Sequence, residues 1–494
     1  MSLNVTMNTT GFNISTGLNL AYINTNTPIY PAVGGKYGYK VLAEVTYRLY
    51  YGASNNAKTV SFTQQISYTN GAFSYLVMDF RNVFSRIPTP QITSIEEIQI
   101  GGIPSYYDSI HNIPFVLATN EWYQRGLLSN TQGMESFRGV ANVVDVKFFE
   151  FYSDTENGIP QKQGATYTKQ IFLFWGRGTE EQGFAIDFTD YKLTSPIKKL
   201  LASNYNEIDS KYYINIGVSE VHTLAFLNKC LINQSAQPEA VNITYYPQAN
   251  AQGTSIGFLN ALNDPLVGGK YNPNLDDESF YQFFPAGIPN LNKTVIDGVK
   301  ITGVIPNSVT GGLSALKSYE IRVTGSLGNN KSTSYIFNIV TYCQNYDQSR
   351  IAYVNEWGAW EYITLNKERT DELSVTKQYL TKPVINQQVG LSQFSADAKN
   401  VAYPPNVAKQ GVMATSVEAR ITTTMWTDNL EEDWQINQIR DLMMSPQIHL
   451  IDGEKAVALI LENSKLQLKR EKNRGIKQYE LKFTFANPKF RTTS

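Results

Sequence analysis

Residues Tyr39–Tyr51 read YKVLAEVTYRLYY, and this stretch shows the pattern that decides the fold. Every second position is apolar, with polar side chains between: the apolar set is Val41, Ala43, Val45, Tyr47 and Leu49, and the polar set is Lys40, Glu44, Thr46 and Arg48. Successive side chains of a β-strand point to opposite faces, so the stretch predicts a strand with one buried face. The same alternation recurs at Val241–Tyr245, Tyr319–Val323 and Tyr479–Phe485.

Turn residues, rather than helical patterns, separate these stretches. Ile171–Trp175 and Phe184–Phe188, for example, flank the polar loop Gly176–Gly183, which predicts a hairpin. The chain has 31 Tyr and 24 Phe, residues that favour pleated, half-buried surfaces. The sequence therefore predicts an all-β chain of several β-sandwich-like modules rather than a parallel α/β sheet.

One segment, Asn429–Met444, has the pattern of a longer α-helix. Asp428 or Asn429 can cap its start, and acidic residues follow where they suit the positive end of the helix dipole. Apolar residues recur at helical spacing, and Ser445-Pro446 ends the segment. We therefore expect one longer helix, near residues 429–444, in the C-terminal module.

The 494 residues are enough for about three domains. Ser153–Gly164 is polar and contains Gly and Pro, so we interpret it as a loop or linker. The predicted division is an N-terminal β module over residues 1–155, a middle β region over 165–345 that forms one module or two, and a C-terminal β module over 346–494.

Composition bounds the function classes. The net charge of -1 argues against a protein whose overall field gathers nucleic acid or anionic membrane. The first residues lack the basic and apolar regions of a signal peptide, and no run has the apolar length of a membrane-spanning helix. Cys230 and Cys343 form neither a disulfide framework nor a zinc pattern. We expect a protein made in the cytoplasm of its host cell, with no membrane insertion.

The strings that resemble catalytic motifs lack the surroundings that the chemistry needs. Gly253–Gly257 matches the G-x-S-x-G elbow around Ser255, but a polar loop containing Pro precedes it instead of a hydrophobic strand. The histidines, His111, His222 and His449, have no metal-ligand spacing. We therefore predict a protein that is not an enzyme, with no catalytic residue, no metal site and no cofactor.

A basic stretch near the C-terminus has two interpretations. Nine Lys and Arg residues lie between Lys465 and Arg491, and they include Lys469, Arg470, Lys472 and Arg474. One interpretation is the solvated face and turn of a hairpin, where Lys protects an edge strand from pairing. The other is contact with DNA phosphates or with an acidic partner.

The string Tyr353–Tyr362, which reads YVNEWGAWEY, resembles a pattern in tail and baseplate proteins of phages of Bacteroidota. An apolar strand runs there into Asn, Gly and an aromatic residue followed by an acidic one, and it predicts a hairpin with Gly358 in the turn. The resemblance continues through the helix ending at Ser445-Pro446 to the strand Tyr479–Phe485. It covers Ile351–Phe485 best, and the length and the Asn- and Tyr-rich N-terminal region are similar to the tail ring proteins of crAss-like phages.

The resemblance implies a virion structural protein: a subunit of a homo-oligomeric ring or baseplate hub that contacts neighbouring tail or portal proteins around the DNA path. Four Trp residues of this region are then candidates for the assembly interface: Trp357, Trp360, Trp426 and Trp434. Two alternatives stay open. A receptor- or glycan-binding tail adhesin would expose an aromatic groove, and a depolymerase would need convergent carboxylates.

Overall fold

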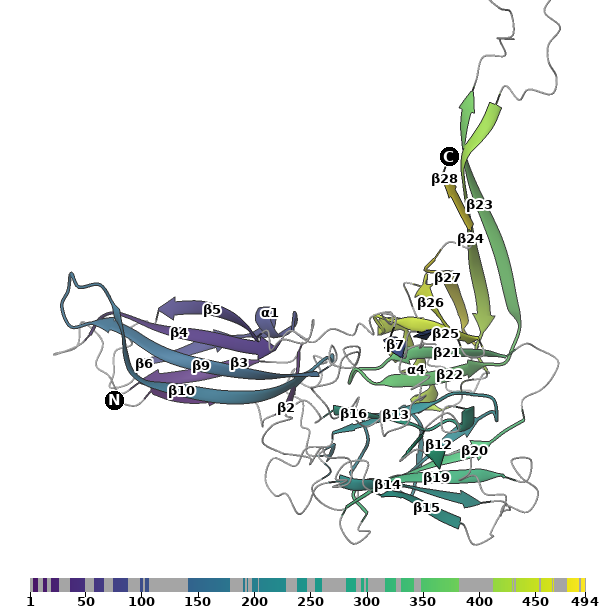
Figure 1. Cartoon of the computed structure of the whole chain (residues 1–494), viewed down its shortest axis with the longest axis horizontal. Helices are drawn as coiled ribbons and strands as arrows, with labels where there is room; N and C mark the ends of the chain where they lie inside the picture. The colour runs from purple at the N-terminus through teal and green to yellow at the C-terminus, as the bar shows by residue number, and fades with distance from the viewer. Residues whose placement is uncertain are drawn as a thin grey trace, which may run out of the picture.

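The computed structural model confirms an all-β architecture of several antiparallel sheets, with one longer helix in the C-terminal part (Figure 1). The structure describes residues 3–7, 12–15, 19–25, 36–48, 57–65, 74–87, 98–100, 103–105, 141–177, 190–191, 193, 198–202, 204–227, 238–246, 254–259, 281–289, 295–296, 299–300, 316–325, 330–341, 348–381, 412–428, 430, 432–452, 455–463, 465, 478–487 and 490–493. Within these ranges, no helix is long and apolar enough to cross a membrane.

The N-terminal module is a sandwich of two sheets. The first has the order β1 (Leu3–Met7), β3 (Leu20–Thr25), β6 (Ser74–Asp79). The second has the order β2 (Phe12–Ile14), β10 (Gln161–Phe174), β9 (Ala141–Ser153), β4 (Tyr37–Arg48), β5 (Ala57–Gln65). The short helix α1 (Arg81–Phe84) follows β6. Strand β4 buries Val41, Ala43, Val45 and Tyr47, as its alternation predicts.

The predicted boundary at residue 155 is wrong in position. β9 and β10 are antiparallel neighbours, with Tyr152 opposite Gln161, so Ser153–Gly164 contains the turn of a hairpin inside the N-terminal sheet. Ile171 and Leu173 belong to the same core as Val146 and Phe148. The predicted hairpin partner of Ile171–Trp175, Phe184–Phe188, lies outside the described residues.

The middle module contains a six-stranded sheet and a two-stranded one. The larger has the order β11 (Asn206–Ile208), β12 (Lys211–Ile216), β20 (Ser334–Ile339), β19 (Ser318–Gly325), β14 (Pro238–Tyr246), β15 (Thr254–Leu259), with β12 and β20 parallel. The smaller pairs β13 (Thr223–Leu227) with β16 (Tyr281–Pro285). Two further hairpins join β7 (Ile98–Ile100) to β8 (Ile103–Ser105) and β17 (Val295–Ile296) to β18 (Val299–Lys300).

The C-terminal module is one eight-stranded sheet with a helix packed on it. The strand order is β22 (Trp360–Leu365), β21 (Ser349–Val354), β25 (Ile448–Asp452), β26 (Lys455–Leu461), β27 (Glu480–Phe485), β24 (Val412–Trp426), β23 (Arg369–Thr381), and β28 (Phe490–Thr493) also pairs with β24. Helix α4 spans Asp433–Met444. It ends at Met444 as predicted, but it begins four residues later than predicted, because Glu432 is the N-cap and forms a reciprocal capping box with Gln435.

The hairpin of β21 and β22 is buried on both faces. Ala352, Val354, Trp360 and Tyr362 belong to the core of the middle module, while Ile351, Tyr353 and Leu365 belong to the core under α4. A strand covered on both sides needs apolar residues at successive positions, and Ile351–Val354 reads IAYV. The middle and C-terminal modules therefore share this hairpin, and residue 345 does not separate two independent cores.

Candidate assembly surface and the junction that supports it

β23 and β24 leave the C-terminal sheet together and form a projecting ribbon (Figure 1), which we call the arm. The arm consists of Arg369–Thr381 and Val412–Trp426, paired along their whole described length. β27 pairs with β24 only at Thr422–Trp426, and β28 pairs with it at Ser416–Ala419. β23 is the last strand in the order of the sheet, so its outer edge has no neighbouring strand among the described residues.

Apolar side chains on the arm are exposed. All ten residues from Asp371 to Leu380 are exposed. Tyr379 is 64% exposed and Leu373 is 56% exposed. The exposed large apolar residues of the arm are Leu373, Val375, Tyr379, Leu380 and Val412. Apolar side chains gathered on an uncovered surface are typical of an interaction site.

The base of the arm is firmly attached. The Arg369 guanidinium donates two hydrogen bonds to the Asp371 carboxylate, both of 2.9 Å, and the Trp426 amide donates to the carbonyl of Glu368 over 3.3 Å. Met425 is buried in the core under α4. The arm therefore continues a packed strand pair and projects from it.

A tight turn joins β21 to β22 and is organised by Asn355. Its Oδ1 accepts hydrogen bonds from the amides of Trp357 and Ala359, both at 2.9 Å. Its Nδ2 donates to the carbonyl of Leu201 at 2.9 Å and to Glu361 Oε1 at 3.0 Å. Gly358, with φ of 77°, takes the left-handed conformation that the turn requires. The predicted hairpin with Gly358 in its turn is confirmed.

Buried carboxylates meet on the face of this hairpin that points to α4. Glu361 is fully buried and accepts hydrogen bonds from Tyr353 Oη (2.9 Å), Asn355 and Asn204 (3.1 Å). Asn204 also donates to Asp441 on α4 over 3.2 Å, and Arg177, just beyond β10, forms an ion pair with Asp441. This cluster therefore joins three parts of the chain: Arg177 just after the N-terminal module, Asn204 in a loop of the middle module, and Asp441 on the C-terminal helix.

The cluster holds more acidic groups than basic ones. Burial and the nearby Glu361 carboxylate raise the pKa of Asp441, although the ion pair with Arg177 lowers it. Burial and the same Glu361 charge raise the pKa of Glu356. In both cases removal from water disfavours the charged form, and Glu361 adds like-charge repulsion.

The opposite face of the hairpin is bonded to the middle module by a second polar network. Arg350 donates to Thr364 Oγ1 over 2.7 Å and to His222 Nδ1 over 3.1 Å, and it lies 3.4 Å from the Glu220 carboxylate. Because arginine has only donors, the Nδ1 atom of His222 must accept this hydrogen bond. Tyr362 Oη forms a 2.9 Å hydrogen bond with Thr223 Oγ1.

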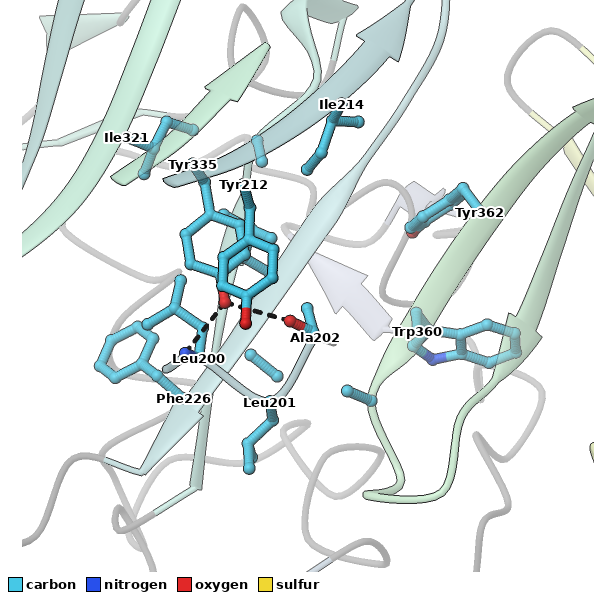
Figure 2. Packing of buried hydrophobic residues seen from close by; sticks show 14 of the residues in the cluster. Leu200, Leu201, Ala202, Tyr212, Ile214, Phe226, Ile321, Tyr335, Trp360 and Tyr362 are labelled. Atoms are coloured by element: carbon cyan, nitrogen blue, oxygen red, sulfur yellow. Dashed lines mark hydrogen bonds between the residues drawn. The ribbon is translucent and has the colours of Figure 1, made fainter. Parts of the chain in front are cut away.

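Apolar residues of the middle-module core pack closely on this side of the hairpin (Figure 2). Tyr335 stacks on Tyr212 at 4.9 Å between ring centroids. The Tyr335 hydroxyl donates to the carbonyl of Ala202 and accepts from the amide of Leu200, both over 3.1 Å. Trp360 and Tyr362, on β22, belong to the same buried cluster. The hairpin is therefore fixed by apolar packing and by hydrogen bonds on both sides.

The predicted interface tryptophans occupy two kinds of position. Trp357 and Trp360 are each 2% exposed and are buried within the chain, between the middle and C-terminal modules. Trp426, at the base of the arm, and Trp434, in the first turn of α4, are only partly buried. Contact of these four residues with a second subunit stays a prediction. In the folded chain, only Trp426 and Trp434 have exposed surface that a second subunit could contact.

Several other predicted residues lie outside the described part of the chain: Lys469, Arg470, Lys472, Arg474, Cys230, Cys343 and His111. Ser255 lies within strand β15, opposite Thr244, whereas a nucleophile elbow needs a sharp turn between a strand and a helix. His222 is buried beside Tyr205 and Arg350, and His449 packs edge-on against Trp360. In the described ranges, no three His, Cys, Asp or Glu side chains are placed to hold a metal ion.

Neither the arm nor the buried acid cluster was predicted from the sequence. The arm has a visible signal, the alternation of Leu373, Val375 and Tyr379 with polar residues, but the pattern does not show that both faces are uncovered. The cluster has no signal, because Arg177, Glu361 and Asp441 lie far apart in the sequence. Comparison of the chain with protein-family models and with curated protein sequences gives no match.

Proposed function

We propose that the protein is a structural subunit of a bacteriophage tail that forms or joins rings around the DNA path, as a tail ring or baseplate hub protein. Its partners are copies of itself in a homo-oligomeric ring and neighbouring tail or portal proteins, and its location is the virion. The arm is the observation that carries this proposal: a long ribbon that exposes Leu373, Val375 and Tyr379 fits a subunit that other chains cover on assembly.

Two further features support the proposal. The segment that resembles phage tail proteins, Ile351–Phe485, contains both the arm and the hairpin from which it projects. That hairpin is packed and hydrogen bonded on both faces, which suits a part that carries load between subunits.

The experiment replaces Leu373, Val375, Tyr379 and Leu380 together with Thr, which keeps strand propensity and removes apolar surface. The variant is supplied to host cells infected by phage that lacks the gene, and particles are imaged by electron microscopy. We expect a folded protein with the circular dichroism spectrum of the wild type, and particles with missing or incomplete tails. The matched control places Thr at four exposed apolar positions elsewhere: Ile159, Ile208, Val218 and Ile460.

Normal infectious particles that contain the arm variant would refute an assembly role for the arm. Complete particles that contain the variant but fail to adsorb to cells would favour the adhesin instead. Absence of the wild-type protein from purified particles would refute the tail assignment itself.

A further inference from the structure

The outer edge of β23 has an unusual charge pattern for an uncovered strand. Exposed edges are commonly protected by charges that repel a second copy or by residues that cannot pair. The side chains of Arg369, Asp371, Leu373, Val375, Lys377 and Tyr379 share one face, because they occupy alternate positions. On this face, complementary side chains lie at equal distances on the two sides of Ser374: Leu373 and Val375, Asp371 and Lys377, and Arg369 and Tyr379.

We propose that the free edges of two copies of β23 pair antiparallel across a two-fold axis at Ser374, so that the free subunit is a dimer. In this register Asp371, which also accepts hydrogen bonds from Arg369 of its own chain, lies opposite Lys377 of the other chain, which makes two pairs of opposite charge. Leu373 lies opposite Val375, and Arg369 lies opposite the ring of Tyr379. Directly opposite side chains of an antiparallel pair are about 5 Å apart, close enough for each of these contacts.

The neighbouring registers that keep the same faces together match less well. An axis at Val375 places Leu373 opposite Lys377 and leaves Asp371 opposite Tyr379. An axis at Leu373 places Arg369 opposite Lys377, which are like charges. Moving one chain by a single residue against the other would place the side chains of one face opposite those of the other face of the pleat. The charges of the edge therefore favour one register, and they favour a second copy of this chain as the occupant.

The geometry of the arm permits this pairing. Every side chain from Asp371 to Leu380 is exposed, so no described part of the chain covers the faces or the edge. At roughly 3.3 Å per residue, β23 offers an edge about 40 Å long. A contact across a two-fold axis uses the same surface on both chains and closes with two subunits. The dimer thus covers the edge before assembly, and this inference does not depend on the tail assignment.

The test uses the purified full chain and analytical ultracentrifugation. We expect the wild type to be dimeric, and the variants D371K and K377D each to weaken the dimer by about tenfold or more, because each places like charges at both pairs. Mixing D371K chains with K377D chains places opposite charges at both pairs again, so the mixture should dimerise. The double variant D371K/K377D should also dimerise with itself.

The matched control is E372K, since Glu372 lies on the other face, opposite Thr376 in this register, and its replacement should leave the dimer unchanged. Circular dichroism and thermal unfolding verify that every variant is folded. A wild type that stays monomeric at about 100 µM overturns the proposal and means that the charges protect the edge from pairing. A mixture that fails to dimerise, or an E372K effect as large as that of K377D, also overturns it.

Discussion

Replacing Trp360 with Ala tests whether the middle and C-terminal modules are one folding unit. The indole is 2% exposed, lies in the core that contains Tyr212 and Tyr335, and meets the His449 ring edge-on at 5.3 Å. Removing a buried Trp side chain costs about 3–5 kcal/mol, because burial is lost and a cavity remains. For a large unit, each kcal/mol lowers the melting temperature by roughly 2–4 °C, so we expect a loss of about 10 °C.

The assay is differential scanning calorimetry of the full chain. The N-terminal module has its own core, which includes Val146 and Phe148, so we expect its transition to be separate. Trp360→Ala should lower the transition of the other two modules and shift the N-terminal one only slightly. Phe148→Ala should do the reverse, because Phe148 is fully buried in the N-terminal core. Ile159→Ala, in the exposed turn between β9 and β10, should change the stability of neither unit by more than about 0.5 kcal/mol.

If Trp360→Ala splits the middle and C-terminal modules into two transitions, or leaves the middle module unchanged, the shared hairpin does not couple them. Ile14, Phe174 and Trp175 link the N-terminal module to the shared core, so a small shift of its transition is expected. An equal shift of both transitions would contradict the separation of the cores.

Three further predictions concern the junction and its surface. Asn355→Ala should cost about 2–4 kcal/mol in urea unfolding, because the buried amides of Trp357 and Ala359 lose their acceptor; a loss below 1 kcal/mol would contradict this. The pKa of Asp441 is raised on folding, so the native chain binds more protons than the unfolded one, and this contribution weakens as the pH rises above about 4. Asp441→Asn should therefore gain stability relative to wild type with rising pH, and a constant difference in melting temperature would refute it. Trp426→Ala and Trp434→Ala should retain most of the melting temperature but reduce incorporation into particles, and full incorporation of both would remove them from the interface.

The alternation of Val41, Ala43 and Val45 predicted a strand correctly because one face of the strand is buried, whereas Leu42, Glu44 and Thr46 on the other face are only partly buried. The boundary near residue 155 was misplaced because a hairpin turn and a linker have the same composition, and only the pairing of β9 with β10 distinguishes them. The start of α4 was placed early because Asp and Asn favour the N-cap position in general, whereas here Glu432 and Gln435 satisfy the free amides.

The sequence does not distinguish a tryptophan at a subunit contact from one in a core. A large aromatic residue provides binding energy at a subunit contact and stability in a core, and the sequence pattern is the same for both. Trp357 and Trp360 follow the apolar run Ile351–Val354, which is typical of a strand covered on both sides, yet the covering partners are distant in the sequence. The sequence alone could not assign them to the contact between two modules of one chain.

The position of the arm in the chain links stability to the proposed assembly. Only Asn366–Glu368 separates the end of β22 from the start of β23, so the exposed ribbon continues from a hairpin that is buried on both faces. The arm is therefore joined at its base to two cores, through Trp360 and Tyr362 on one face of β22 and through Leu365 on the other. A projecting ribbon on a flexible attachment would lose conformational entropy when a partner orders it, whereas one fixed at its base binds with less loss. The buried polar networks around the hairpin would thus favour the proposed binding at the arm, although their residues do not belong to the arm.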